Sequence, residues 1–178
     1  PTFRRPGCHV FSFYRLPESE QQRIKAVLER ENAVLIEKHH YLTYRDYPID
    51  KPSLCSLVVP SNKQAEIDVQ ELYLAADIMI SDYSGGIIDY GLLKKPAIHF
   101  VYDLEEYVNE DSGLAYDLNA VAVGPFVRTL EELERVLVQM LRAPTFTPAP
   151  NYQELVAYEK GVAGERILEF INRQMGDE

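Results

Sequence analysis

Apolar and polar positions follow two different periods along the chain, and the two periods predict alternating strands and helices. Short apolar runs bounded by polar residues predict buried strands over 33–38, 54–59, 77–81 and 96–100. Apolar residues that recur every three or four positions predict helices over 19–32, 68–75, 87–93, 129–142, 152–160 and 164–175, cap residues included. This alternation predicts an α/β fold, Rossmann-like, with a mostly parallel sheet and helices on both faces.

Length and composition are those of one globular domain. The chain has 178 residues, of which 46% are hydrophobic, so a single domain over 1–178 can bury a real core. No run of 18 apolar residues occurs, and no signal peptide is visible, so no membrane-spanning helix is expected. Because Pro1 is not a natural initiator, we expect the chain to be part of a longer protein.

The charge balance narrows the choice of ligand. A net charge of −10 argues against nucleic acid or anionic lipid as a partner of this domain, since both require basic patches. Local basic groups near the start and at Lys38 to His40 instead suit a compact anionic ligand. The two cysteines indicate a reducing compartment. The adjacent pair His39 and His40 would point to opposite faces of a strand, so neither a metal nor a cofactor is predicted.

The most informative segment is the turn that follows the strand over 77–81. Ser84, Gly85 and Gly86 stand at the carboxyl end of that strand, where ligands of open α/β sheets bind. Backbone N–H groups without side chains, a hydroxyl and a helix start form a site suited to a phosphate or diphosphate. Asp89, three residues beyond Gly86, would accept hydrogen bonds from ribose hydroxyls. The alternative is a plain strand–turn–helix in which Asp89 is a favourable charge near a helix start.

Four strings resemble the carboxyl-terminal half of the CDP-glycerol glycerophosphotransferase family, the teichoic-acid polymerases and primases. Residues 1–4 (PTFR) resemble the family's A-P-T-[WF]-R loop, and residues 38–40 (KHH) its [RK]-x-H strand end. Residues 76–93 resemble its S-D-I-L-I-T-D-Y-S-S string, and 96–107 its P-[IV]-x-F-[YF]-x-Y-D string. A weaker likeness at 161–171 extends the resemblance over nearly the whole chain.

The resemblance implies the carboxyl-terminal, nucleotide-binding half of a glycosyltransferase-B architecture, with an amino-terminal acceptor domain outside this chain. The family transfers glycerol phosphate from CDP-glycerol, or ribitol phosphate from CDP-ribitol, to a polyol-phosphate polymer and releases CMP. It works at the cytoplasmic face of the bacterial membrane, so membrane association is expected to be peripheral and through the rest of the protein. The family's base lies in the amino-terminal half, so this domain alone is expected to be inactive.

The resemblance also assigns roles to residues. Arg4 and His40 would be the catalytic groups that stabilise the leaving CMP. As alternatives, Arg4 is a solvated loop residue, His40 pairs with backbone, and Asp82 caps its turn instead of orienting the site. The residues expected to bind the donor are Thr2, Lys38, Asp82, Ser84, Gly85, Gly86 and Asp89.

One departure from the family pattern leaves the donor open. The family has two serines where this chain has Ser84 and Gly85, and the S-G-G form is also similar to nucleotide-sugar enzymes such as UDP-sugar epimerases. Two alternatives therefore stand beside the polyol-phosphate transferase: a UDP-sugar transferase or epimerase domain, and a non-catalytic Rossmann-like interaction domain.

Overall fold

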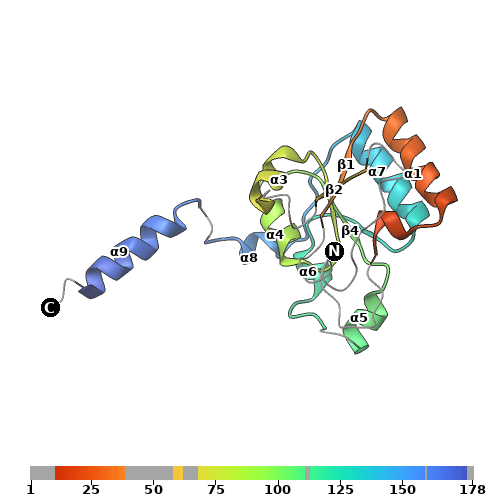
Figure 1. Cartoon of the computed structure of the whole chain (residues 1–178). Coiled ribbons are helices and arrows are strands. Elements are labelled where there is room, and N and C mark those ends of the chain that lie inside the picture. The colour runs from red at the N-terminus through yellow and green to blue at the C-terminus, as the bar shows by residue number, and fades with distance from the viewer. Residues whose placement is uncertain (1–10, 39–57, 62–67, 111–112, 159, 176–178) are drawn as a thin grey trace.

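The computed structural model describes residues 11–38, 58–61, 68–110, 113–158 and 160–175 (Figure 1). The helices are η1 (Phe13–Arg15), α1 (Glu18–Arg30), α3 (Val69–Ala75), α4 (Gly85–Gly91), α5 (Leu104–Glu110), α6 (Leu118–Val121), α7 (Leu130–Arg142), α8 (Tyr152–Leu155) and α9 (Ala163–Met175). The strands are β1 (Leu35–Lys38), β2 (Val58–Ser61), β3 (Met79–Ser81), β4 (Ala97–Phe100) and β5 (Phe126–Val127).

Every described strand pair is parallel, as the alternating pattern predicts. β4 lies between β3 and β5, with Ile80 opposite Ile98 and His99 opposite Phe126. β1 pairs with β2 in a second, two-stranded sheet. The α/β class is therefore confirmed, although the described strands form two sheets where one was expected.

The central strand β4 is buried on both faces, and each face packs against a different set of helices. Ile98 and Phe100 belong to a core cluster with residues of α7, among them Leu133 and Leu137. Ala97 belongs to another cluster, made with Ile87 and Tyr90 of α4, Val123, and Tyr152 of α8. Because successive side chains of a strand point to opposite faces, this division places helices on both sides of the three-stranded sheet.

Helices α1 and α7 lie side by side and run in the same direction (Figure 1). Arg23 of α1 forms an ion pair with Glu134 of α7, and Glu31 just beyond α1 binds Arg142 at the end of α7. Both pairs join residues 111 positions apart, which requires parallel helices. Below these ion pairs, Leu130 packs against Ile24 and Leu28 of α1 and also joins the α7 core, so the two clusters are continuous.

Several predicted boundaries are corrected by the structure. β2 continues through Pro60, which was expected to close the strand over 54–59; residues 54–57 lie outside the described part. α4 begins at Gly85 and not at residue 87, because the Ser84 side chain caps it there. α8 ends at Leu155, short of the predicted 160. The short elements α6 and β5 were not predicted, because four and two residues carry too little periodicity.

The last helix, α9, projects away from the rest of the molecule (Figure 1). Its apolar residues recur at helical spacing and stay 44–75% exposed, namely Ile167, Leu168, Phe170, Ile171 and Met175. None of its residues is buried. Within the described ranges, no helix has both the length and the apolar character needed to cross a bilayer.

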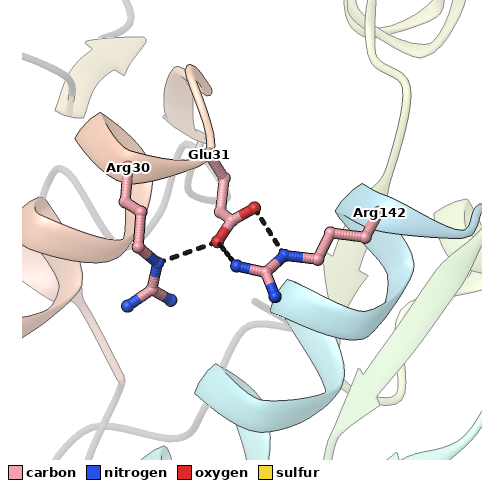
Figure 2. Close-up of polar contacts among 3 residues, drawn as sticks. All are labelled: Arg30, Glu31 and Arg142. Atoms are coloured by element: carbon pink, nitrogen blue, oxygen red, sulfur yellow. Dashed lines mark hydrogen bonds and ion pairs between the residues drawn. The ribbon is translucent and has the colours of Figure 1, made fainter.

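Glu31 gives the helix pair a pH dependence that can be measured. Its carboxylate accepts hydrogen bonds from Arg142 Nε at 2.9 Å and Arg142 Nη2 at 2.5 Å, and from Arg30 Nε at 2.8 Å (Figure 2). The bonds to Arg142, and then that to Arg30, lower the pKa of Glu31 from 4.5 to about 2. A lowered carboxyl pKa stabilises the fold above the unfolded value and loses that effect as pH falls through the folded value.

We therefore expect Glu31→Gln to lower the midpoint of thermal unfolding at pH 7, with the difference from wild type shrinking between pH 4.5 and about 2. Because Arg142 is well exposed, the effect should be modest and weaker in 1 M salt. Glu29→Gln, which removes an exposed carboxylate within α1, is the matched control. A difference between Glu31→Gln and wild type that is the same at pH 2 and pH 7 contradicts the assignment.

The exposure of α9 predicts that the helix adds little to the stability of the domain. A chain ending after Gly161 should unfold within about 1 °C of the full chain, since no side chain described for the removed residues is buried. Tyr152→Ala, which empties a fully buried site between α4 and α8, should instead cost about 3–5 kcal/mol. Differential scanning calorimetry measures both, and a large loss on truncation would contradict the exposed position of α9.

Candidate functional site

The turn between β3 and α4 starts a helix through the side chain of Ser84. Ser84 has extended backbone angles, and its Oγ accepts a hydrogen bond from Gly86 N–H at 3.2 Å. Because an accepting hydroxyl still carries its own proton, Ser84 can donate one hydrogen bond outward. The Gly86 N–H is already used by the cap, which differs from the expectation that all amides of this turn face a ligand. Among the described residues, the Gly85 N–H has no hydrogen-bond partner.

The two glycines of the turn have different surroundings. A Cβ atom on Gly86 would collide with Tyr73 Oη, because Tyr73 of α3 lies directly against the first turn of α4. A Cβ on Gly85 would meet no atom within 4 Å. Gly86 therefore permits the close approach of α3, whereas Gly85 leaves open space at the start of α4. Tyr73 was not singled out from the sequence, since a tyrosine in a short helix carries no local signal.

Asp89 lies exposed on α4, one turn beyond Gly86. Its charge reaches two tyrosines that border the helix. Burial first, and then the charge of Asp89, raise the pKa of Tyr73, and the same two causes raise the pKa of Tyr152 to about 12. Both phenols are thus neutral donors at physiological pH, and the Asp89 carboxylate remains accessible to a ligand hydroxyl.

The carboxyl ends of β3 and β4 meet at one edge of the sheet, as parallel pairing requires. Tyr83, from the turn after β3, donates a hydrogen bond to Asp103 Oδ1 at 3.0 Å, just before α5. The Tyr83 ring also stacks on Tyr107, with centroids 4.4 Å apart and ring planes at 20°. The turn that carries Ser84 is therefore anchored to the segment after β4.

Of the remaining predicted site residues, two are described by the structure and three lie outside the described ranges. Asp82 is buried, at 2% exposure, directly after β3. Lys38 is half-buried at the end of β1, in the other sheet. Thr2, Arg4 and His40 lie outside the described residues, so their roles stay predictions. In the described ranges, no group of three or more His, Cys, Asp or Glu side chains has an arrangement that could hold a metal ion.

One buried polar residue beside the turn was missed by sequence reasoning. His99 of β4 is 1% exposed and touches the backbone of the Asp82–Ser84 turn through Asp82. The signal was present, because a histidine stands alone in the otherwise apolar run Ala97-Ile98-His99-Phe100. A sequence pattern alone does not tell a bonded core histidine from an exposed one.

The parallel strands with helices on both faces define a Rossmann-like α/β fold of the kind found in glycosyltransferase-B architectures. The family model described as CDP-Glycerol:Poly(glycerophosphate) glycerophosphotransferase matches residues 1–173. The chain belongs to this family, as its four sequence strings predicted.

Curated relatives and a solved structure agree with this assignment. The chain is 33% identical over 104 residues to the teichoic acid poly(glycerol phosphate) polymerase of Bacillus subtilis (strain 168), covering 57% of this chain and 14% of that protein. It is 31% identical over 108 residues to the teichoic acid ribitol-phosphate polymerase TarK of Staphylococcus aureus (strain NCTC 8325 / PS 47), covering 61% and 20%. The wall teichoic acid polymerase TagF shares the fold, with a TM-score of 0.66 at 23% identity over 99% of this chain and 43% of that one. The chain thus spans less than half of each relative.

The glycine environments predict opposite effects of the same substitution. Gly85→Ala should keep or raise the free energy of unfolding, by up to about 1 kcal/mol, because the methyl group meets open space and glycine is a poor helix residue. Gly124→Ala should destabilise by about 2 kcal/mol or more, because its methyl group would collide with the carbonyl of Ala97 in β4. Urea unfolding of the two variants measures both. Equal losses would contradict the open space at Gly85.

Proposed function

We propose that this chain is the donor-binding domain of a polyol-phosphate transferase that uses CDP-glycerol or CDP-ribitol. The observation that carries the proposal is the family match over residues 1–173. The enzyme would extend a teichoic-acid or capsule-like polymer and release CMP. The acceptor polymer would bind an amino-terminal domain outside 1–178, and the rest of the protein would hold the enzyme at the inner face of the cell membrane.

The proposed reaction is a phosphoryl-type transfer. A hydroxyl oxygen of the acceptor forms a bond to the phosphorus that carries the polyol, and the bond from that phosphorus to the oxygen of CMP breaks. The acceptor proton passes to a base in the other domain, and CMP leaves with the additional negative charge. Such reactions depend on fixing the diphosphate and neutralising this charge, which we assign to Arg4 and His40.

The turn after β3 would hold the diphosphate with two donors. Because its Oγ accepts the Gly86 N–H, Ser84 would donate its hydroxyl proton to a phosphate oxygen, and the Gly85 N–H would donate a second bond. Gly86 would contribute its own N–H only after the Ser84 side chain turned away. The exposed carboxylate of Asp89 would accept from the ribose. Thr2, Lys38 and Asp82 would complete the donor site.

The cap hydrogen bond also supports the opposite view, that the turn is purely structural and the domain binds partners without chemistry. Open space at Gly85, where the family carries serine, supports the UDP-sugar alternative, because a larger donor would fit there. Calorimetric titration of the 178-residue chain with CDP-glycerol, CMP, UDP and UMP distinguishes the polyol-phosphate transferase, the nucleotide-sugar enzyme and the interaction domain. Preference for cytidine supports the proposal, and preference for uridine supports a nucleotide-sugar enzyme. No saturable binding at millimolar nucleotide would contradict both.

Two substitutions at Ser84 separate its hydroxyl from its cap. Glycine at a helix N-cap costs only a few tenths of a kcal/mol, whereas alanine costs about 1 kcal/mol. Ser84→Gly should therefore keep the stability of the domain and leave cytidine binding unchanged. It should weaken the binding of CDP by up to about tenfold, because the hydroxyl's hydrogen bond to a charged group is lost while the Gly86 N–H is freed. Ser84→Ala should weaken CDP as much and also lower the stability. Equal losses for CDP and cytidine would assign Ser84 to structure alone.

A further inference from the structure

Both ring nitrogens of His99 are bonded to backbone groups of other segments. The Nδ1 atom lies 3.0 Å from the carbonyl oxygen of Asp82, and the Val123 N–H donates to Nε2 at 3.2 Å. A carbonyl can only accept and an amide N–H can only donate, so the ring must carry its proton on Nδ1 and none on Nε2. Burial lowers the pKa of His99 and outweighs Asp82, which acts in the opposite direction. The lowered pKa favours this neutral form of the ring.

The two hydrogen bonds join His99 to two different segments, one after β3 and one before β5. On one side, the backbone around Val123 is fixed independently: Pro125 O accepts from His99 N–H at 2.9 Å, and Gly124 passes so close to β4 that a Cβ would collide with Ala97. On the other side, Asp82 begins the turn that leads to Ser84. The ring therefore connects the backbone beside β5 to the first residue of this turn.

We propose that His99 is a positioning residue that holds the Asp82–Ser84 turn in place, so that the Ser84 hydroxyl and Gly85 N–H face the donor diphosphate. The identity of the ligand in this proposal, the donor diphosphate, depends on the proposed function. A residue serving only to fill space would be apolar here, because a buried imidazole costs free energy unless both nitrogens are bonded. His99 offers a donor to the Asp82 carbonyl and an acceptor to the Val123 N–H, and an apolar side chain would offer neither.

Two isosteric variants each retain one of the two bonds. Asparagine places its amide near the Nδ1 position, so His99→Asn can still donate to the Asp82 carbonyl. Glutamine reaches the Nε2 position, so His99→Gln can still accept from the Val123 N–H. Both variants lose one buried hydrogen bond, and we expect both to lose about 1–3 kcal/mol of unfolding free energy. A purely structural role would therefore not distinguish them.

The turn itself provides the first readout. Amide hydrogen exchange of Gly86, measured by NMR on the full 178-residue chain and normalised to the core amide of Leu133, reports how often the capped turn opens. We expect His99→Gln to speed exchange at Gly86 about tenfold while Val123 stays protected, and His99→Asn to do the reverse. Equal exchange at Gly86 in the two variants would overturn the proposal.

The second readout is the dissociation constant for CDP, measured by calorimetry. His99→Gln should raise the dissociation constant for CDP about tenfold, whereas the constant for His99→Asn should stay within about threefold of the wild-type value. Equal weakening in both variants would overturn the positioning role. Should wild type fail to bind CDP while the exchange pattern holds, the proposed function fails and the control of the turn by His99 stands on exchange alone.

Discussion

The structure depends on one strand that is enclosed on every side. β4 is bonded to parallel neighbours at both edges and covered by helices on both faces, so each of its four residues is buried. Because water does not reach such a strand, each polar group on it must form a hydrogen bond within the protein, and each side chain must fit the space left by its neighbours. The close passage of Gly124, the packing of α7 and α4, and the contacts of His99 all follow from this requirement.

How much the sequence predicts depends on whether an interaction is local. Helix starts at Asp68 and Thr129 are set by side chains that bond amides two or three residues away, so the pattern locates them closely. The ion pair of Glu31 with Arg142 joins residues 111 positions apart, and no local pattern indicates it. The same limit explains why the local turn of Ser84 and Asp89 was singled out, whereas Tyr73 and His99, which approach it from other segments, were missed.

Family membership and site geometry contribute different parts of the functional picture. The match over residues 1–173 assigns the class, and a shared fold at 23% identity adds the architecture. Neither assigns the donor, because glycerol-phosphate and ribitol-phosphate polymerases match at similar identity. At Gly85, the first residue of α4, this chain differs from the family pattern. Packing does not require glycine there, because a Cβ atom on Gly85 would meet no atom within 4 Å.

The empty space beside Gly85 has a practical consequence. A cysteine introduced there would stand at the mouth of the turn without displacing any neighbour, and an attached environment-sensitive dye would sample the solvent beside Ser84. The fluorescence of such a label would respond directly to any molecule that settles on this edge of the sheet. The missing side chain thus offers an attachment point for an optical sensor, with which libraries of nucleotides could be screened.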